Sequence, residues 1–432
     1  MNAFFHSVAL DKDKCIGCTT CIKRCPTEAI RVRNGKAQIS AQRCIDCGEC
    51  IRVCTKGAKR AHSTRLSALE NWEYKVAIPA PALFGQFNHL DDIDIVLNGL
   101  KKIGFDEVYE VSRGAEVVSD VTRKMLAENK LKLPVISSAC PAVVRLIRQR
   151  FPSLIDNVLP IKAPMEVTAR MAKTEVSAKR GVPMEKVGVF FITPCPAKVT
   201  DFAAPIGSAR SWVDGAISIA KVYPKLSEAM DKEVDVQNLE KIAKSGMTGV
   251  RWATSGGESK AAVEDRYLAA DGIENVINVL EQLEDERIQD IDFVELNACN
   301  GGCVGGVLCV ENPYIAKARI QRLNKFLPAS QNHYEHFMNQ MINWTQELEY
   351  TPVMKLSEDL EEAVSMMSEI EQLRTLLPGI DCGSCGSPTC KAFAEDVVKG
   401  KVSESDCIFI LKDKVKQAAQ ALSQLGVEDD SK

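Results

Sequence analysis

Two groups of four cysteines near the start of the chain share one spacing. Each group reads Cys-x2-Cys-x2-Cys-x3-Cys, and Pro26 follows the first. Three closely spaced thiolates can bind one face of an iron–sulfur cubane, while the fourth reaches the neighbouring cluster. Zinc sites instead use two close pairs separated by a longer loop. The spacing therefore predicts two [4Fe–4S] clusters with crossed ligands. One is predicted to bind Cys15, Cys18, Cys21 and Cys54, and the other Cys25, Cys44, Cys47 and Cys50.

A third group of four cysteines, with a different spacing, lies near the end of the chain. It reads Cys-x2-Cys-x4-Cys-x16-Cys and comprises Cys382, Cys385, Cys390 and Cys407. Glycines at 379, 383 and 386 allow the backbone to wind tightly around a metal. The group resembles the Fe–S module of corrinoid iron–sulfur proteins and of a ferredoxin-like subunit of membrane electron-transport complexes. It favours a further [4Fe–4S] cluster, with zinc as the alternative.

Five of the 17 cysteines remain outside these groups: Cys140, Cys195, Cys299, Cys303 and Cys309. A lone buried cysteine is usually a small hydrophobic residue. Here, however, Cys140 and Cys195 each follow an apolar strand and precede a proline, and Cys299 and Cys303 stand in a glycine-rich loop. Four thiolates on three loops at strand ends can hold one more cluster, because glycines let the backbone approach a bulky inorganic group.

Alternating strands and helices must position these three loops. Apolar runs predict strands at Tyr74–Ile78, Glu107–Val111, Val135–Ser137, Val187–Ile192 and Phe293–Leu296. Helical periodicity predicts helices at Ile93–Ile103, Val117–Glu128, Ala142–Arg150, Ala163–Lys179 and Ser259–Tyr267. We therefore expect an α/β domain with mixed sheets flanked by helices and with its cluster loops at strand ends.

The pattern divides the chain into four parts. We expect an α+β two-cluster ferredoxin-like domain at 1–65, the α/β domain at 66–350, a linker helix at 351–378, and a small Fe–S module with a tail at 379–432. The linker has an apolar seam from Leu356 to Leu377, with Ser357 as the expected N-cap. Packing of this seam on the core is favoured over a stalk that forms a homodimer.

Composition restricts the classes of function. The chain has 432 residues, 45% of them hydrophobic and 26% charged, with a formal net charge of −4. Such a chain can bury a core, and it offers no overall positive field for nucleic acid. The sequence shows neither a secretory signal nor an apolar run that could span a membrane. Clustered thiols in a reducing compartment indicate metal binding, so a cytoplasmic location is expected.

The three cysteine loops resemble the signature segments of the [FeFe]-hydrogenase family, in the same order. That family has T-S-C-C-P, P-C-x-x-K and E-x-M-A-C-x-x-G-C-x-x-G-G. This chain has Ser137-Ser-Ala-Cys-Pro141, Pro194-Cys-Pro-Ala-Lys198 and Glu295-Leu-Asn-Ala-Cys-Asn-Gly-Gly-Cys-Val-Gly-Gly306. The resemblance covers the chain from the ferredoxin-like repeats to about Tyr314, and extends less closely to the end.

The resemblance implies a hydrogenase that interconverts H₂ with protons and electrons. Its H-cluster would be a [4Fe–4S] cluster on Cys140, Cys195, Cys299 and Cys303, which Cys303 joins to a two-iron subcluster with CO, cyanide and a bridging dithiolate amine. Lys198 would bind a cyanide ligand. Three further [4Fe–4S] clusters would carry electrons to a ferredoxin-like or other redox partner. Maturation proteins would supply the two-iron group.

Three departures from the family pattern bear on rate. Ala139 replaces the cysteine that passes protons to the bridging amine, so this relay is absent. Thr193 and Asn297 replace two methionines beside the subcluster. With the terminal module, these changes resemble a divergent sensory branch of the family, here without a PAS domain. A slow enzyme with an H₂-sensing or regulatory role and a signalling partner is implied. Candidates for another proton route are Glu116, Asp120, Glu258, Glu295 and Cys309, each expected to be solvated or structural.

Two other classes remain open. The chain could be a non-catalytic relative, like the hydrogenase-like proteins of cytosolic Fe–S assembly, which lack the two-iron subcluster. It could also be an electron-relay subunit of a larger oxidoreductase, in which the basic stretch Lys56–Arg65 docks an acidic partner. A solvated surface is the favoured interpretation of that stretch.

Overall fold

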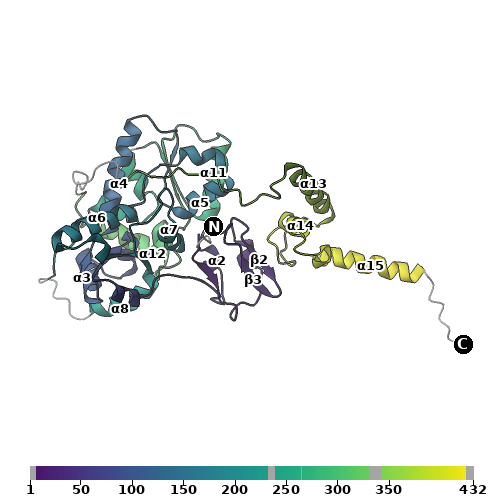
Figure 1. Cartoon of the computed structure of the whole chain (residues 1–432), viewed down its shortest axis with the longest axis horizontal. Coiled ribbons are helices and arrows are strands. Elements are labelled where there is room, and N and C mark those ends of the chain that lie inside the picture. Colours follow the sequence, from purple (N-terminus) through teal and green to yellow (C-terminus); the bar gives the residue numbers. More distant parts are fainter. Residues whose placement is uncertain (1–5, 232–238, 264, 331–341, 425–432) are drawn as a thin grey trace. The chain divides into compact units, whose positions relative to one another are not determined.

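The computed structural model describes residues 6–231, 239–263, 265–330 and 342–424 (Figure 1). The chain divides into two compact units. The first unit contains residues up to 8, the short segment 45–48, and residues 61–351. The second unit contains residues 9–44, 49–60 and 352–432. The segment that carries Cys47 therefore belongs with the first unit, although it lies inside the second cysteine repeat.

A four-stranded parallel sheet organises one half of the first unit, in the order β6-β5-β8-β9. Its strands are β5 (Tyr74–Pro79), β6 (Glu107–Val108), β8 (Val187–Thr193) and β9 (Gly215–Ser218). Every residue of β8 is buried. This burial is typical of a parallel strand whose two faces are both covered by helices.

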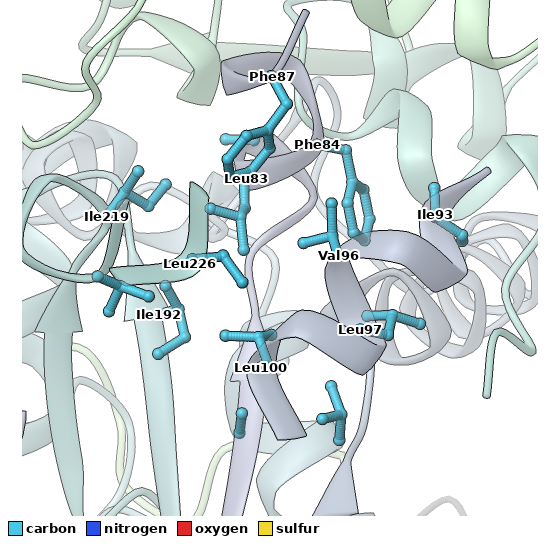
Figure 2. Close-up of a cluster of buried hydrophobic side chains, with 14 of the residues drawn as sticks. Leu83, Phe84, Phe87, Ile93, Val96, Leu97, Leu100, Ile192, Ile219 and Leu226 are labelled. Atoms are coloured by element: carbon cyan, nitrogen blue, oxygen red, sulfur yellow. The ribbon is translucent and has the colours of Figure 1, made fainter. Parts of the chain in front are cut away.

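Alternate side chains of this sheet pack into two different hydrophobic clusters. Val76 and Val189 face helix α6 (Pro164–Arg180). Phe190 and Ile192 face the opposite cluster, which includes helices α3 (Ile93–Lys102) and α8 (Ile219–Asp231). Figure 2 shows part of this second cluster, where side chains of α3, β8 and α8 converge. The two-residue period of a strand thus buries both faces of the sheet.

A three-stranded parallel sheet organises the other half, in the order β10-β11-β7. Its strands are β7 (Val135–Ile136), β10 (Tyr267–Asp271) and β11 (Phe293–Asn297). Ile136 and Val294 pack with α5 (Pro141–Arg150) and α11 (Ile273–Glu284), whereas Val135 and Phe293 pack with α4 (Val111–Ala127). The expected α/β fold class is confirmed.

Shorter elements complete the first unit. Its remaining α-helices are α7 (Pro196–Ala203), α9 (Met247–Arg251), α10 (Gly257–Ala262) and α12 (Pro313–Leu323). Its 3-10 helices are η1 (Leu66–Asn71), η2 (Pro81–Gln86), η3 (Pro152–Asn157), η4 (Met184–Lys186) and η6 (Cys303–Gly305). Within the described residues, no helix combines the length and the apolar character needed to cross a membrane.

The second unit combines the ferredoxin-like segment with the C-terminal module. The first part contains β1 (Val8–Leu10), α1 (Thr20–Lys23), β2 (Ile30–Arg33), β3 (Lys36–Ile39), α2 (Glu49–Arg52) and β4 (Lys59–Ala61). β2 and β3 form an antiparallel hairpin, and β1 pairs with β4. The second part contains α13 (Leu360–Leu376), α14 (Cys390–Val398), η9 (Glu404–Asp406) and α15 (Ile408–Gln424).

The linker helix α13 begins later than predicted and uses its seam in two ways. Its N-cap is Asp359, whose carboxylate accepts the Glu362 amide at 2.9 Å, and not Ser357. Near its C-terminal end the seam packs on the terminal module, with buried Ile370, Leu373 and Leu377. Near its N-terminal end Leu360, Val364 and Met367 are exposed. Core packing therefore applies only to the C-terminal half, and the homodimer stays a prediction.

Two predicted boundaries were wrong. The strand expected at Glu107–Val111 ends at Val108, and Val111 begins α4. The helix therefore begins six residues before its predicted start at Val117, and it packs closely on α6 at Gly114, where a Cβ would lie 2.3 Å from Thr168 Oγ1. The helix expected at Ser259–Tyr267 ends at Ala262, because Tyr267 enters the sheet as β10, opposite Phe293.

Candidate metal centre

Each of the three cysteine loops of the first unit begins where a buried parallel strand ends. Cys140 follows β7 and Cys195 follows β8, and each is the N-cap residue of the next helix. A proline occupies the first turn of both helices, where its missing N–H costs no hydrogen bond. Cys299 and Cys303 follow β11. The strand-end position expected from the sequence is thus confirmed for all three loops.

The loops enclose a cavity of about 90 Å³. Cys140, Cys195 and Cys303 line it, together with Ala139 and Lys198. Burial, followed by the charge of nearby Cys140, raises the pKa of the Cys195 thiol to about 11. Burial also raises the pKa of Cys303, followed by the effects of Cys195 and Cys140. The three thiols are therefore close enough to repel one another as thiolates, and a bound metal would supply the charge that keeps them deprotonated.

The fourth predicted ligand, Cys299, is buried in the same loop as Cys303, and its carbonyl accepts the Gly302 amide at 3.1 Å. This loop requires its glycines. Gly302 has a φ of +91°, and a Cβ there would lie 2.4 Å from the Ser255 amide nitrogen. A Cβ at Gly306 would lie 2.3 Å from the Pro194 carbonyl oxygen, in the Cys195 loop. These two glycines let the loops pack close together.

Lys198 extends the site on helix α7. Its Nζ atom is buried and makes no hydrogen bond, and the nearest carboxylate oxygen, Asp201 Oδ2, lies 3.5 Å away. A buried ammonium at a cavity that makes an ion pair at 3.5 Å but no hydrogen bond can still donate to an anionic ligand in that cavity. This buried ammonium is the observation that bears most directly on whether the cavity suits a cofactor. Together with the cysteine thiols, it fits a metal cofactor that carries negatively charged ligands.

Two buried carboxyl groups, Glu258 and Glu295, line the same cavity. Glu258 Oε2 accepts the Ser137 hydroxyl at 2.7 Å, and the same hydroxyl oxygen accepts the Ala139 amide at 3.1 Å. Glu295 accepts the amides of Gly256 and Ser259 at 2.9 and 2.8 Å. Burial, followed by the charge of Glu295, raises the pKa of Glu258 to about 8. Glu258 therefore carries a proton at neutral pH.

The two replaced methionine positions hold polar side chains that bind their own loops. The Thr193 hydroxyl donates to the Cys195 carbonyl at 3.1 Å and accepts the Cys195 amide at 3.3 Å. Asn297 lines the cavity, and its Nδ2 donates to Glu295 Oε1 at 2.8 Å. Thr193 thus shapes the turn that presents Cys195, and Asn297 connects the cavity to the carboxyl network.

The other proton-route candidates lie elsewhere. Glu116 accepts the Gly246 amide at 2.6 Å, and Asp120 pairs with Arg123 on the surface of α4. The Cys309 thiol lies 3.7 Å from the Cys303 carbonyl oxygen and packs against the hydrophobic core. None of these three lines the cavity. By contrast, Glu258 and Glu295 line it and are buried and hydrogen-bonded, so of the two expected environments, solvated or structural, the solvated one does not apply to them.

The sequence analysis missed Asp46, which joins the Cys47 segment to the rest of the first unit. Its buried carboxylate accepts the amides of Ser7 and Val8 at 3.1 and 3.0 Å and the Thr200 hydroxyl of α7 at 2.9 Å. Cys47 packs against the same hydrophobic cluster as Cys140 and Cys195. The neighbouring cysteines on both sides marked this loop for metal binding, but nothing in the sequence indicated that it contacts α7.

In the second unit, the thiols of the first predicted ferredoxin-like set lie together. Burial raises the pKa of Cys21, and Cys18, Cys15 and Cys54 add to the rise as neighbouring charges. The two repeats also share a local hydrogen bond. The Ala29 amide donates to Cys25 Sγ and the Ala58 amide donates to Cys54 Sγ, each at 3.2 Å and four residues after the cysteine. Such bonds to sulfur tune cluster potentials.

The terminal group of cysteines surrounds a separate small cavity. All four predicted ligands line it: Cys382, Cys385, Cys390 and Cys407. The carboxylate of Asp381 accepts the Cys390 amide at 2.6 Å and so fixes the start of α14 beside the first turn of the group. The structure therefore gathers four thiols that are separated by up to 25 residues.

Family models match three segments of the chain. The model described as "Iron only hydrogenase large subunit, C-terminal domain" matches residues 73–267 and 214–307. A 4Fe-4S dicluster domain matches residues 7–55, and an Fe-S cluster family matches residues 377–409. Because the first match covers more than half of the chain, the protein belongs to the iron-only hydrogenase family. It is an [FeFe]-hydrogenase-like iron–sulfur protein.

Named relatives agree with this assignment at low identity. NADP-reducing hydrogenase subunit HndD of Solidesulfovibrio fructosivorans is 26% identical over 259 residues, which are 48% of this chain and 44% of the relative. Iron hydrogenase 1 of Clostridium pasteurianum is 23% identical over 373 residues, 69% of this chain and 64% of the relative. The chain thus spans less than two thirds of the length of either protein.

Two further likenesses bear on the fold and on the alternative functions. The cytosolic Fe-S cluster assembly factor nar1 of Aspergillus flavus is 25% identical over 138 residues, 31% of this chain and 24% of the relative. A solved variant of [FeFe]-hydrogenase HydA1 from Chlamydomonas reinhardtii superposes with a TM-score of 0.51 at 16% identity, covering 65% of this chain and 95% of that chain. The second likeness supports the fold of the first unit.

Proposed function

We propose that the chain is an [FeFe]-hydrogenase that interconverts H₂ with two protons and two electrons. The arrangement around one cavity supports this proposal: Cys140, Cys195 and Cys303 line it beside the buried Lys198 ammonium, which has no hydrogen-bond partner. A likeness of fold would leave the chemistry open. A buried cation beside grouped thiols suits a metal cofactor with anionic ligands.

The cavity residues have distinct roles in this proposal. Cys140, Cys195, Cys299 and Cys303 hold the [4Fe–4S] part of the H-cluster, and Cys303 also holds the two-iron part. When bound, this group supplies the site of heterolytic H₂ cleavage, with CO, cyanide and a bridging dithiolate amine on its irons. Lys198 donates a hydrogen bond to an anionic ligand. Thr193 fixes the Cys195 turn.

Glu258 takes over the proton transfer that Ala139 cannot perform. Its carboxyl group lines the cavity and is protonated at neutral pH, because burial and Glu295 raise its pKa to about 8. An acid of this kind can release a proton into the cavity and recover one afterwards. Ser137 orients the Glu258 carboxyl and also holds the Ala139 amide. Glu295, at the same wall, is the group from which Glu258 recovers its proton.

The replacements at Ala139, Thr193 and Asn297 suggest a slow enzyme with an H₂-sensing or regulatory role. Loss of the thiol lengthens proton transfer, and polar neighbours alter the electronic surroundings of the cofactor. Three [4Fe–4S] clusters would pass electrons to a ferredoxin-like or other redox partner in the cytoplasm. Maturation proteins would deliver the two-iron group, and a signalling partner would respond to the redox state.

A non-catalytic Fe–S protein or an electron-relay subunit is the alternative. The similarity to an assembly factor over 31% of the chain favours the first of these, and the similarity to a hydrogenase subunit favours the second. Neither role requires a buried lysine without a hydrogen bond at the cavity. The hydrogenase proposal predicts two more iron atoms per chain than the alternatives, so iron analysis of matured protein distinguishes them.

Infrared spectroscopy tests the proposal directly. Protein matured with the full cofactor should show absorption bands of iron-bound CO and cyanide, and should evolve H₂ with a reduced dye. In Lys198→Ala the bands should shift or weaken, because an anionic ligand loses its donor. Fully reconstituted [4Fe–4S] clusters without these bands would leave the non-catalytic alternative.

A further inference from the structure

The turn that carries Cys382 and Cys385 packs directly on the ferredoxin-like segment of the same compact unit. The Val32 amide of β2 donates to the Gly386 carbonyl at 2.7 Å, and the Lys23 ammonium of α1 donates to the Asp381 carbonyl. Both ends of the turn are therefore hydrogen-bonded to the segment that carries the first cysteine repeat (Figure 1, α14 beside β2 and β3).

Two glycines permit this close contact. A Cβ at Gly386 would lie 2.0 Å from the Val32 carbonyl oxygen, so no side chain fits there. A Cβ at Gly383 would lie 3.3 Å from Lys23 Cε and 3.5 Å from Thr19 Cβ, which is direct packing. Because the obstacle at Gly386 is backbone, a larger residue can be accommodated only if the turn moves away from β2.

A buried carboxylate holds α14 against the same hairpin. Asp396 Oδ2 accepts Arg31 Nε at 2.5 Å, Arg33 at 2.7 Å and the Ser387 hydroxyl at 2.9 Å. Arg33 also donates to the Cys385 carbonyl at 3.2 Å. The Asp396 side chain is only 6% exposed, so this ion pair is screened less by solvent than a surface pair would be. Arg33 thus contacts both the cysteine turn and the helix.

The contact lies at the first of the two ferredoxin-like cysteine sets. Thr19, which packs on Gly383, stands between Cys18 and Cys21 in the chain. At the other side of the hairpin, Lys36 Nζ donates to the Cys15 carbonyl at 2.7 Å and the Ala37 amide donates to Cys15 Sγ at 3.4 Å. One edge of the ferredoxin-like segment therefore contacts the terminal turn and also carries three thiols of the first set.

We propose that the terminal four-cysteine set exchanges electrons with the set Cys15, Cys18, Cys21 and Cys54, and so forms the outer end of the electron chain. The inference rests on the cluster assignment in the proposed function, but not on H₂ chemistry. The step is a one-electron transfer: one [4Fe–4S] cluster is oxidised as its neighbour is reduced, and no other reactant is needed. The Gly386 and Arg33 contacts fix the terminal turn against the segment that carries the first set.

Electron paramagnetic resonance tests this proposal in the full chain reconstituted with [4Fe–4S] clusters but without the two-iron group. In Cys385→Ser, which lacks the terminal cluster, the reduced protein gives the spectrum of the ferredoxin-like pair alone. The wild type should show additional broadening and faster spin relaxation, because the terminal cluster is magnetically coupled to that pair. Gly386→Ala and Arg33→Ala should each give the spectrum of the pair plus an uncoupled terminal signal.

Gly400→Ala is the matched control. Gly400 has a φ of +66°, comparable with +79° at Gly386, but nothing lies within 4 Å of its Cβ position. The same backbone strain without the clash should leave the coupled spectrum unchanged. Arg33→Ala lies outside the terminal module and so tests undocking in a module that still folds.

A wild-type spectrum equal to the sum of the pair and an isolated terminal signal would overturn the proposal, as would coupling that persists in both undocked variants. Binding of zinc in place of iron at the terminal set would overturn it as well. Coupling without infrared bands of CO and cyanide would support this inference while refuting hydrogenase chemistry. Infrared bands of CO and cyanide without magnetic coupling would support hydrogenase chemistry while refuting this inference.

Discussion

The three cysteine loops of the first unit and the terminal turn of the second unit both gather thiols, but different forces position them. Cys140 and Cys195 stand at the ends of parallel strands whose two faces are packed by helices. The terminal set has a much smaller core, formed by Ile370, Leu373, Leu377, Phe393, Ala394 and Cys407. The packing of strands and helices therefore shapes the first site, whereas we expect the second to depend on a bound metal for stability.

The chemical surroundings of the two cavities also differ. The cavity of the first unit is lined by a lysine with a buried ammonium, Lys198, and by a carboxyl group with a raised pKa, Glu258. In the described residues, the lining of the terminal cavity includes no lysine, arginine or glutamate. A site that moves protons needs such groups, while a site that only stores an electron does not. This difference agrees with the proposal that the first unit carries the chemistry and the terminal module stores an electron.

Among the changes considered, Glu258→Gln should have the largest effect on H₂ turnover by the first unit. We expect turnover to fall by roughly 10²–10⁴-fold, because the amide cannot donate and recover a proton. H₂ evolution by matured protein measures the loss, with infrared spectra to verify cofactor content. Glu116→Gln is the control, since Glu116 is a buried carboxylate that binds Gly246 outside the cavity. Equal losses in both variants would contradict a role in proton transfer.

The pH dependence of turnover should follow the same group. The pKa of Glu258 is raised to about 8, so the acid form predominates below that pH. Proton reduction should therefore fall as pH rises above about 8, where Glu258 loses its proton. In Glu258→Gln this decline should disappear from the residual rate. A decline that survives in the variant would assign it to another group.

Removal of metal should destabilise the terminal module more than the first unit. Hydrogen exchange on cluster-free protein should show protected amides in β5 and β8, because their packing does not involve metal. Amides of α14 should lose protection, because a small core rarely supplies more than about 3–5 kcal/mol on its own. Protection of α14 equal to that of β8 would show that the terminal module folds without metal.

A smaller effect is expected at the carboxylate that ties the Cys47 segment to α7. Burial alone would raise the pKa of Asp46, but His6, Arg145, Val8 and Thr200 together lower it below its ordinary value. The ionised Asp46 therefore stabilises the fold at neutral pH. This stabilisation is lost as the pH falls below the ordinary pKa of a carboxyl group and through the lowered pKa of Asp46. Thr200→Val should cost about 1 kcal/mol and speed exchange of the Val8 amide. Thr200→Ser, which keeps the hydroxyl, should not.

Ala139→Cys should have the smallest effect. The new thiol would restore a titratable group at the cavity, so H₂ turnover should rise if proton delivery limits the rate. We expect a modest gain, because Glu258 already serves the cavity. The same substitution in the Glu258→Gln background should give a larger relative gain. An unchanged rate in both backgrounds would indicate that another step limits turnover.

Cysteine spacing predicted the strand-end loops well, because each motif combines a local turn requirement with a buried strand. The strands β9 and β10 were missed, since Gly215–Ser218 and Tyr267–Asp271 are short and carry no strong alternation. The start of α4 was misjudged because close packing at Gly114 is a tertiary effect. The local sequence pattern was therefore enough to predict the loops that a motif specifies. It was not enough to predict element boundaries that depend on packing against distant residues.

The contacts that could not be predicted from the sequence join residues that are far apart along the chain. Ser137 meets Glu258 across 121 residues, and Asp46 meets Thr200 across 154. The contact of Gly386 with Val32 likewise joins the two ends of the chain. Each of these residues is ordinary in its own segment, so only the fold reveals its role. Lys198 could be predicted because a family motif marks it, although the missing hydrogen bond at its ammonium is a structural finding.

The central claim is that the cavity of Cys140, Cys195 and Cys303 holds an H-cluster that turns over H₂. Infrared spectra of protein matured with the complete cofactor test it most directly. The account predicts bands of iron-bound CO and cyanide that change when H₂ replaces an inert gas and that are lost in Cys303→Ser. Protein with its full complement of [4Fe–4S] clusters but no such bands would contradict the claim.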